Sequence, residues 1–277
     1  MTIVSIGEIL WDVYPDSSRL GGAPFNFAVN AHRLGHRVLF VSATGDDELG
    51  AAARKKAAEL GLDTGFIQVA AGKSTGHVTV RLDAGGQPDY TIHRPAAYDF
   101  LKLSDEQLAR IAKLEPEWIY FGTLYQMNEG AHGELHRLME ALPRARRFYD
   151  VNLRRGSYTP ELVRESIGLA HAVKLNHEEA ELFPGFGGVW AAAVTRGDRG
   201  CEVRIGGDRV ECPAYPVAVA DTVGAGDAFA AALLHGISQG WSAAKAGDFA
   251  NRLGALVASR AGAVPAWSAA ELDTFKA

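Results

Sequence analysis

"DTVGAGDAFAAALLHGI", residues 221–237, passes from a polar turn into an apolar helix and decides how the rest of the chain is interpreted. Gly224 and Gly226 permit backbone angles that other residues avoid, and they let another group approach the main chain closely. From Ala228 onward the composition favours a helix, and the apolar run at 216–220 upstream predicts a buried strand. The stretch therefore predicts a strand, a glycine-rich turn and a helix that holds Asp227 in or near its first turn.

Two interpretations of this turn compete. In the first, Asp227 or Asp221 only caps the helix, because aspartate suits a helix N-terminus. Alternatively, the free N–H groups of the turn form an anion site. A carboxylate beside an anion site then suggests a base for a hydroxyl that attacks a phosphoryl group.

Composition narrows the class of protein. The chain has 277 residues, 47% of them hydrophobic and 22% charged, which is ordinary for a folded protein, and we expect a single domain over residues 1–277. Its net charge of −5 gives no support for nucleic-acid binding. No apolar run is long enough to span a membrane, and the first residues lack the features of a signal peptide, so we expect a cytoplasmic protein without a membrane partner.

Apolar runs alternate with helical patterns along the chain. Strands are predicted at 2–7, 37–43, 118–124, 146–152, 172–176, 189–195 and 216–220. Helices are predicted at 24–35, 46–61, 104–114, 129–142 and 159–172. Helix ends carry suitable residues, including Gly35 and Gly61 after helices and Thr159-Pro160 before one. Apolar strands separated by helices predict an α/β fold with a mainly parallel sheet covered on both faces.

Two segments depart from this alternation. Residues 75–94 hold two alternating strands around Gly85-Gly86-Gln87-Pro88, with no helix between them. We expect a small β lid from about 12–22 and 75–98, over the carboxyl ends of the parallel strands, where such sheets bind ligands. In "CEVRIGGDRVEC", a two-residue turn at Gly206-Gly207 would place Cys201 opposite Cys212 as packed thiols without an assigned function. The other face of this hairpin would hold the diagonal pairs Glu202–Arg209 and Arg204–Glu211.

Three further motifs do not fit the functions they suggest. "AAGKSTG" at 70–76 ends like a P-loop, but it lacks the first glycine and precedes a strand, so we interpret it as a loop. "HGELH" places His132 and His136 one helical turn apart, yet glutamate does not follow the first histidine as zinc proteases require. With no third ligand in the sequence pattern, a metal role is disfavoured there. No dinucleotide-binding motif follows the first strand.

Taken together, these segments resemble the PfkB, or ribokinase-like, family of sugar kinases. "DTVGAGDAF" resembles the C-terminal signature of the family, and "GGAPFNFAVNAHRLG" at 21–35 resembles its N-terminal motif. "GEILWDVYP", "GDDELG", "DVNLR", "KLNHEEAELF", "VTRGDRG" and "FANRLGALVASRAGA" resemble other family blocks, in the family order. Within this family, "GEILWDVYP", "GGAPFN" and "YTIHRPAAYD" most resemble the corresponding blocks of fructokinases. The resemblance implies a ribokinase-like sandwich with a small β lid.

The resemblance also implies roles for individual residues. Asp227 would be the catalytic base, and the N–H groups of Gly224, Ala225 and Gly226 would stabilise the transferring phosphoryl group. The substrate-binding positions would be Asp12, Gly21, Gly22, Asn26, Tyr90, Arg94 and Asn152. The nucleotide-binding positions would be Arg154, which follows Asp150 in "DVNLR", and Asn176, Thr195, Gly197, Gly200 and Asn251. Each of these residues alone could serve a simpler structural role, such as a helix cap or a turn. A site is favoured because all of them occur together in the order typical of the family.

Metal ions enter through the same resemblance. Asn176 and Glu179 match an element that organises Mg²⁺ and phosphates, with Glu179 acting through water. A monovalent cation such as K⁺ would lie near Asp221 and the carbonyl groups of Val223, Val257, Arg260 and Gly262.

The implied activity is transfer of the γ-phosphoryl group of ATP to a primary hydroxyl of a sugar, with D-fructose favoured. Ribose, 2-keto-3-deoxygluconate or a nucleoside are alternative substrates, and a non-catalytic sugar sensor on the same scaffold is a further alternative. A homodimer through the lid strands is also an expectation. The chain departs from the family at 184–188, where "PGFGG" leaves room for only a short turn in place of a helix.

Overall fold

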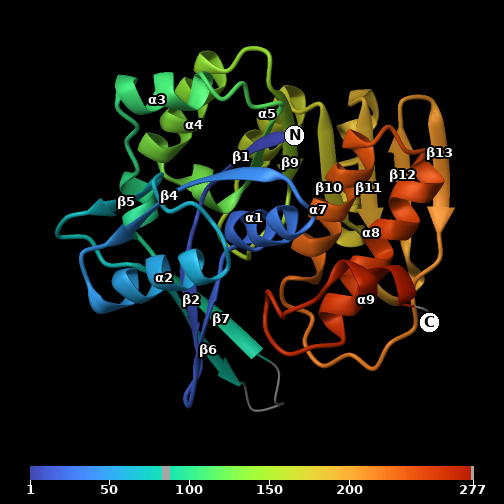
Figure 1. Cartoon of the computed structure of the whole chain (residues 1–277), viewed down its shortest axis with the longest axis horizontal. Coiled ribbons are helices and arrows are strands. Elements are labelled where there is room, and N and C mark those ends of the chain that lie inside the picture. The colour runs from blue at the N-terminus through green and yellow to red at the C-terminus, as the bar shows by residue number, and fades with distance from the viewer. Residues whose placement is uncertain (83–87, 276–277) are drawn as a thin grey trace.

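The structure is a computed structural model that describes residues 1–82 and 88–275 (Figure 1). Its large sheet contains β1 (Thr2–Ile6), β4 (Arg37–Gly45), β5 (Ile67–Ala70), β8 (Trp118–Gly122), β9 (Arg146–Asp150), β10 (Ala172–Asn176), β11 (Ala191–Thr195), β12 (Cys201–Ile205) and β13 (Asp208–Cys212). In the described part of the chain the strand order is β13-β12-β11-β10-β9-β8-β1-β4-β5. The strands from β5 to β11 run parallel, whereas β12 and β13 are antiparallel to their neighbours. The predicted mainly parallel α/β sheet is confirmed.

Helices cover both faces of this sheet. They are α1 (Ala23–Arg33), α2 (Glu48–Glu59), α3 (Asp105–Ala112), α4 (Glu129–Ala141), α5 (Pro160–Leu169), α6 (His177–Leu182), α7 (Ala225–Ser238), α8 (Ala243–Ala258) and α9 (Ala269–Thr274), with short 3₁₀ turns η1 (Ala97–Phe100), η2 (Leu124–Met127), η3 (Pro184–Gly188) and η4 (Gly197–Arg199). Side chains alternate between the faces along each strand. Tyr120 of β8 therefore packs with α1 and α7, whereas its neighbour Phe121 packs with α4.

The helix α7 lies between α1 and α8 and packs against both. Most of its side chains are buried, as expected for a helix that is apolar on all sides. A Cβ atom at Gly236 would lie 2.8 Å from the Cβ of Ala246, so the glycine lets α8 approach closely. Phe27 of α1 stacks on Tyr120 with ring centroids 3.7 Å apart, which fixes α1 on the sheet. This packing places the N-termini of α1 and α7 at one edge of the sheet.

Most predicted helix and strand positions are confirmed, with small shifts at the ends. Thr159 caps α5 through its hydroxyl, and Ser104 forms a capping box with Gln107 at the start of α3. The strand predicted at 216–220 is wrong: no strand is assigned to these described residues, and Val219 is 62% exposed. The nearby Pro213 and Pro216 have no N–H group to donate to a neighbouring strand, and the sheet ends at β13.

A second, small sheet is built from β2 (Leu10–Val13), β3 (Ser18–Gly21), β6 (Gly76–Leu82) and β7 (Pro88–His93). Within the described residues its order is β3-β2-β6-β7, with β2 and β6 parallel and the outer pairs antiparallel. Of the predicted turn at 85–88, all but Pro88 lies outside the described residues. Figure 1 shows β2, β6 and β7 projecting from the lower side of the large sheet.

The antiparallel edge agrees with the hairpin predicted there. Cys201 faces Cys212 in the register of β12 and β13, and both are buried free thiols. Arg209 pairs with Glu202 at 2.8 Å as expected from diagonal neighbours. The other diagonal pair we expected, Arg204 with Glu211, is wrong. The guanidinium of Arg204 donates instead to the carbonyls of Phe186 and Val189, and Glu211 pairs with Arg196.

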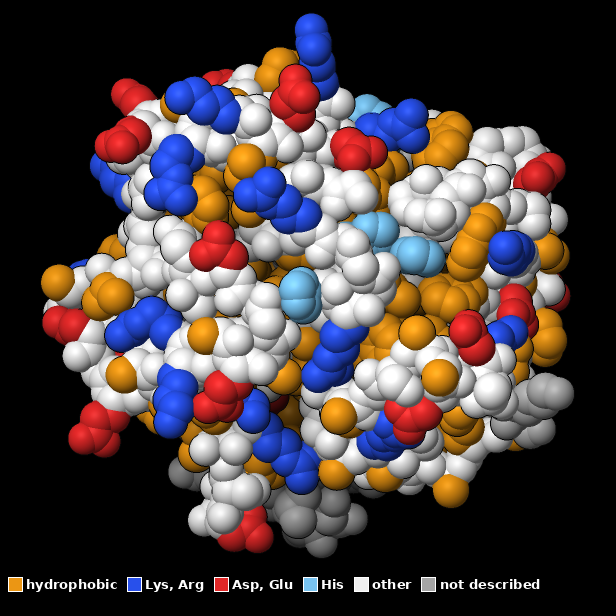
Figure 2. Space-filling view, in the orientation of Figure 1, with side chains coloured by type: hydrophobic (Ala, Val, Ile, Leu, Met, Phe, Trp, Pro, Cys, Tyr) orange, Lys and Arg blue, Asp and Glu red, His pale blue; other side chains and the backbone are white. Residues whose placement is uncertain are grey.

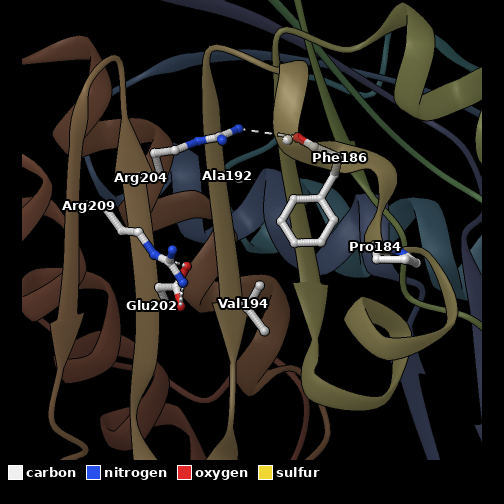
Figure 3. Close-up of a pocket in the computed structure, with 8 residues that line it drawn as sticks. Pro184, Phe186, Ala192, Val194, Glu202, Arg204 and Arg209 are labelled. Atoms are coloured by element: carbon white, nitrogen blue, oxygen red, sulfur yellow. Dashed lines mark hydrogen bonds and ion pairs between the residues drawn. The ribbon is translucent and has the colours of Figure 1, made fainter.

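Those carbonyls belong to the shortened connection between β10 and β11. As expected from the sequence, it contains only the short α6 and η3. A groove of about 190 Å³ remains beside β11 and β12. Figure 3 shows Phe186 and Pro184 of η3 on one side of this groove and Glu202, Arg204 and Arg209 on the other. The residues that line this groove in the described structure include none from the glycine-rich turn at 224–226.

The surface carries charges of both signs. Figure 2 shows acidic and basic side chains interspersed over one face, with hydrophobic side chains between them. Within residues 1–82 and 88–275, no helix has the length and apolar character needed to cross a membrane.

Candidate active site

The first turn of α7 opens into a cleft at the edge of the sheet. Gly224 occupies the N-cap position with φ of 81° and offers no side chain to cap the helix. A Cβ atom there would lie 2.0 Å from the carbonyl oxygen of Ala263, so glycine is required for this close approach. The first N–H groups of a helix lack intrahelical acceptors and attract anions. The predicted glycine-rich turn is therefore present at the N-terminus of a helix that begins at Ala225 and holds Asp227 in its first turn, and anion binding by this turn stays a prediction.

Asp227 lies in this first turn with its side chain buried. The residue is 7% exposed, and Asn26 Nδ2 donates to Asp227 Oδ2 at 2.8 Å. Burial and the nearby charge of Asp150 raise the pKa of Asp227, whereas Lys174 and the bond from Asn26 lower it, and the net pKa is about 6. The carboxyl group is thus ionised at neutral pH and has one oxygen without this bond.

A buried ion pair lies beneath the same turn. Lys174 Nζ is 3.1 Å from Asp150 Oδ1, and Tyr120 donates its hydroxyl to Asp150 Oδ2 at 2.9 Å. Burial alone would lower the pKa of Lys174, but the surrounding carboxylates of Asp150, Glu179 and Asp227 raise it overall. A Cβ atom on Gly226 would lie 2.9 Å from Lys174 Nζ, so the ammonium group is next to the helix start.

Lys174 lines the site although we did not predict it from the sequence. A lysine within the apolar strand "AVKLN" was the available signal, because a buried lysine needs a partner. That partner is Asp150, which the register of β9 and β10 places directly opposite.

The cleft has a volume of about 380 Å³. Predicted residues that line it are Asp12, Gly22, Asn26, Tyr90, Asn152, Arg154, Val223, Gly224, Gly226 and Asp227. Lining residues that we did not predict include Glu8, Leu10, Val78, Ile92, Leu124 and Lys174. The structure therefore joins the small sheet, the start of α1 and the start of α7 around one cavity.

Two further carboxyl groups that line this cavity, those of Glu8 and Asp12, have raised pKa values. Burial raises the pKa of Glu8 to about 7. Burial also raises the pKa of Asp12 to about 6, while Arg154 acts in the opposite direction. Glu8 was missed, although an acidic residue just after a buried strand is a signal for a site at the sheet edge. Gly22, with φ of 111°, is required here because a Cβ atom would lie 2.5 Å from the Glu8 carbonyl oxygen.

Gly21, Asn152 and Tyr90, which we predicted to bind substrate, have different surroundings. Gly21 lies beside Asp12, since a Cβ atom on it would be 3.3 Å from Asp12 Oδ2. Asn152 has a positive φ of 39° and accepts a hydrogen bond from Arg154 Nη1 at 2.8 Å. Tyr90, on β7, is 45% exposed at the cavity mouth.

Arg94 departs from the predicted arrangement. Its guanidinium donates to both carboxylate oxygens of Asp99 and, at 2.6 Å, to the carbonyl of Leu124. It is absent from the residues that line the cavity in the described structure. Because the neighbouring Asp99 is buried and charged, Arg94 serves as its partner.

The predicted nucleotide residues follow the carboxyl ends of neighbouring strands. Asn176 of β10 and Thr195 of β11 are paired in the parallel register. Asn176 forms a capping box with Glu179, whose Oε2 accepts from the Asn176 N–H at 2.8 Å. Glu179 Oε1 accepts from the Leu153 N–H at 2.7 Å, and the residue is 3% exposed. Each oxygen therefore accepts one main-chain N–H bond and retains a second lone pair, and the role of Glu179 toward Mg²⁺ stays a prediction.

Gly200 and Asn251 meet the same short piece of backbone after β13. A Cβ atom on Gly200 would lie 2.0 Å from the carbonyl oxygen of Cys212. Asn251 Nδ2 donates to the carbonyls of Cys212 and Pro213 at 3.2 and 2.9 Å. Gly197 begins η4 with open space around it. Gly200 and Asn251 thus shape the loop at 213–220, and these three residues do not line the cavity described above.

The residues predicted to hold a monovalent cation come together only in part. Asp221 accepts from the N–H groups of Val223 at 3.0 Å and Gly262 at 3.1 Å, and from Arg19 Nη1 at 2.6 Å. The Val257 carbonyl accepts from the Arg260 N–H at 3.0 Å. Arg19 supplies a positive charge at Asp221 in this arrangement, and a monovalent cation at these residues stays a prediction.

Comparison with known proteins agrees with the geometry. The pfkB family carbohydrate kinase profile matches residues 3–270. Fructokinase-1 from Oryza sativa subsp. japonica is 31% identical, over 95% of this chain and 93% of its own length. A crystal structure of an uncharacterized sugar kinase from Pyrococcus horikoshii in complex with ATP is 29% identical, with a TM-score of 0.88 over 99% of this chain and 98% of that one.

A second solved structure matches at similar coverage. It is aminoimidazole riboside kinase from Salmonella enterica complexed with aminoimidazole riboside and an ATP analog, which is 26% identical. Its TM-score is 0.82 over 99% of both chains. With the family profile spanning nearly the whole sequence and the glycine-rich turn at 224–226 present in the structure, this chain belongs to the PfkB family of carbohydrate kinases.

Proposed function

We propose that the chain transfers the γ-phosphoryl group of MgATP to a primary hydroxyl of a sugar, most favourably D-fructose, with Asp227 as the base. The observation that carries this proposal is the placement of a buried carboxylate at the open N-terminus of α7. A carboxylate in the first turn of a phosphate-binding helix repels the phosphate. Its presence there is therefore best explained by a role in the reaction. Proton removal from an attacking hydroxyl is such a role.

In the proposed step, the hydroxyl oxygen of the sugar forms a bond to the γ-phosphorus while the bond to the β,γ-bridging oxygen breaks, and ADP leaves. The hydroxyl proton passes to Asp227 Oδ1, because Oδ2 already accepts from Asn26. N–H groups at 224–226 stabilise the charge on the transferring group. Their fixed orientation requires no rearrangement during the reaction. Asp227 then releases the proton to water.

Lys174 and Arg154 supply positive charge on two sides of this reaction. Lys174 lies beneath the helix start and opposes the rise in the pKa of Asp227. Arg154 is exposed at the cavity edge, where its guanidinium can bind a phosphate oxygen pair. We propose that ATP lies along the carboxyl ends of β10 and β11 toward Thr195, and the ATP complex of the Pyrococcus horikoshii relative supports this nucleotide.

The sugar would occupy the cavity between Asp12, Asn26 and the small sheet. Asp12 can accept hydrogen bonds from sugar hydroxyls, and the amide oxygen of Asn26 has no hydrogen-bond partner within the described residues although it is buried. A buried acceptor without a partner is costly. A hydroxyl donor from the substrate would satisfy it.

The small sheet would then act as a lid. Arg19 of β3 reaches across to Asp221, in the loop before α7, at 2.6 Å. This ion pair joins the small sheet to the catalytic turn in the described structure. Closing the cavity in this way would exclude water and limit ATP hydrolysis.

Charge and shape support one substrate class over another. The carboxyl groups of Glu8, Asp12 and Asp227 all face the cavity, which disfavours a sugar acid such as 2-keto-3-deoxygluconate. D-fructose is favoured by the fructokinase relative at 31% identity. A riboside is the second candidate, because an apolar wall formed by Val78 and Ile92 could contact a base, and the Salmonella enterica relative binds a riboside.

The test is ADP release with MgATP and a panel of D-fructose, D-ribose, 2-keto-3-deoxygluconate, D-mannose, D-glucose, adenosine and aminoimidazole riboside. We expect the largest kcat/KM for D-fructose. A larger value for a riboside would overturn the substrate while leaving the mechanism intact. Sugar binding without ADP release from the folded protein would contradict the kinase mechanism and favour a sensor.

A further inference from the structure

Three side chains converge on the surface between α4 and α5, away from the cavity described above. His132 and His136 lie one turn apart on α4, and Glu165 lies on α5. Glu165 Oε1 is 3.6 Å from His132 Nε2 and 3.5 Å from His136 Nε2. In the sequence the histidine pair had no third ligand. The fold supplies one from a helix that begins 24 residues after His136.

The tautomer of His132 follows from a chain of hydrogen bonds. Gln126 Nε2 donates to the carbonyl of Gly122 at 2.9 Å, which orients the buried amide because a carbonyl can only accept. The amide oxygen, Oε1, therefore faces His132 Nδ1 at 3.3 Å. Nδ1 must carry the proton in this contact, so a neutral His132 presents the lone pair of Nε2 toward Glu165. An outer hydrogen bond that fixes the ring in this way is typical of metal-binding histidines.

His136 adds a second nitrogen to the same point. Its Nε2 is buried and has no hydrogen-bond partner within the described residues. In the tautomer that carries its proton on Nδ1, this buried nitrogen and the carboxylate oxygen 3.5 Å away are two acceptors that face each other. A cation between them would satisfy both.

The spacing of these atoms agrees with a tetrahedral site. Ligand atoms about 2.1 Å from zinc at tetrahedral angles lie about 3.4 Å apart. The two nitrogen–oxygen distances, 3.6 and 3.5 Å, are close to this value, and all three ligand atoms lie within 4.8 Å of one another. Only the separation between the two histidine nitrogens needs side-chain adjustment, and both rings are on the surface side of α4 with exposed fractions of 26% and 33%.

We propose that His132, His136 and Glu165 bind a divalent transition-metal ion of the zinc type, with a fourth position open to water. Two imidazoles and one carboxylate are suitable ligands for zinc and poor ones for magnesium, which prefers oxygen. The bound ion clips α4 to α5 and so stabilises the folded chain by mass action.

The site differs from that of a zinc protease. Glu134, between the two histidines, is turned inward, where it accepts from the Leu103 N–H at 2.9 Å and pairs with Arg137 at 3.0 Å. It is only 4% exposed and cannot serve as a base for a metal-bound water at this site. We therefore assign metal binding to the three residues and no hydrolytic reaction.

The test uses the full chain without a histidine tag, stripped of metal and free of nucleotide. Calorimetric titration with ZnCl₂ should give one ion per chain, and the Tm should rise by roughly 5 °C at a hundredfold excess of zinc over Kd. His132→Ala and His136→Ala should each weaken binding by about a hundredfold, and Glu165→Gln by at least about tenfold. His177→Ala is the matched control, because His177 has a carboxylate of Glu181 at 3.3 Å but no second histidine. It should bind zinc like the unmodified chain.

The visible absorption of bound Co²⁺ tests the site independently on the unmodified chain. Co²⁺ bound by this site should show the intense visible absorption of four-coordinate cobalt, which ZnCl₂ removes on competition. The proposal is wrong if the folded chain binds no zinc in stoichiometric amount, if binding survives loss of both histidines or of Glu165, or if cobalt shows only the weak spectrum of the hydrated ion.

Discussion

Asn26 and Asp227 are 201 positions apart in the sequence, yet Asn26 Nδ2 donates to Asp227 Oδ2 at 2.8 Å in the buried centre of the site. The bond joins the first turn of α1 to the first turn of α7, so it fixes the position of the proposed base. It also lowers the pKa of Asp227 against the larger effect of burial. One contact therefore sets both the orientation and the proton affinity of this carboxyl group.

Replacing Asn26 should alter both properties. In Asn26→Ala, the pKa of Asp227 loses one of the effects that hold it down, so the acidic limb of the kcat/KM profile should move to higher pH. We expect kcat/KM at pH 7 to fall at least about tenfold. The measurement is a pH profile of initial rates. Asn128→Ala is the control, since Asn128 caps α4 outside the site and should leave the profile in place.

The unmodified enzyme should itself lose activity in acid. The pKa of Asp227 is about 6, so kcat/KM should be half-maximal near pH 6 and should fall about tenfold for each further unit of acidification. A profile that stays flat from pH 7 to pH 5 would exclude Asp227 as the titrating base. The same profile recorded at two ionic strengths separates a buried base from exposed charges, which salt screens.

Glu8 gives a prediction about stability. Its pKa is raised from 4.5 to about 7, so the folded chain holds a proton that the unfolded chain releases between these values. The associated stabilisation is present below about pH 4.5 and is lost as the pH rises through about 7. Glu8→Gln removes this loss, and the free energy of unfolding at pH 8 should increase by up to about 3 kcal/mol.

Urea unfolding at two pH values checks this prediction. The stabilisation by Glu8→Gln should be large at pH 8 and small at pH 5. Glu140→Gln, at an exposed position of α4, should have little effect at either pH. Equal stability of Glu8→Gln and the unmodified chain at pH 8 would show that burial does not perturb Glu8.

Gly224 tests the geometry of the catalytic turn. In Gly224→Ala, the new Cβ would meet the Ala263 carbonyl oxygen at 2.0 Å, so the loop at 260–263 must move away from the start of α7. We expect kcat to fall at least about a hundredfold as the N–H groups lose their alignment. Gly72→Ala is a matched control, because Gly72 also has a positive φ, 68°, but has open space around it. It should cost only about 1 kcal/mol of stability and leave kcat unchanged.

Arg19 tests the proposed lid. Arg19→Gln removes the ion pair with Asp221, which is partly exposed, so the folded chain should keep its stability. We expect KM for the sugar to rise several-fold and ATP hydrolysis without sugar to increase, since the small sheet no longer closes on the turn. Coupled assays with and without sugar measure both. Arg209→Gln, which breaks an exposed pair at the sheet edge, should change neither.

Local sequence patterns were sufficient to predict most elements of the fold. Alternation of apolar strands with capped helices predicted the parallel sheet, and Gly224-Ala225-Gly226 predicted the turn at α7. The strand predicted at 216–220 was wrong although the composition favours one. Pro213 and Pro216 cannot donate to a neighbouring strand, and the sheet ends at β13, so these residues have no partner strand. Strand formation depends on a neighbour, which composition does not reveal.

The missed residues depend on contacts distant in sequence. Lys174 is explained only by Asp150 on the neighbouring strand, and the position of Arg94, which we had predicted to bind substrate, depends on the Leu124 carbonyl 30 residues away. Glu165 becomes a candidate metal ligand only when α5 packs beside α4. Each is a polar side chain whose partner lies on another element, so the tertiary structure was needed to identify it.

The central claim is that Asp227 removes the proton from the sugar hydroxyl, and Asp227→Asn tests it most directly. The amide preserves the size of the side chain and cannot take up the proton, so kcat should fall at least about a thousandfold while the calorimetric Kd for sugar changes little. Asp248→Asn, on the surface of α8, should retain full activity. Retention of full kcat by a folded Asp227→Asn would contradict the account.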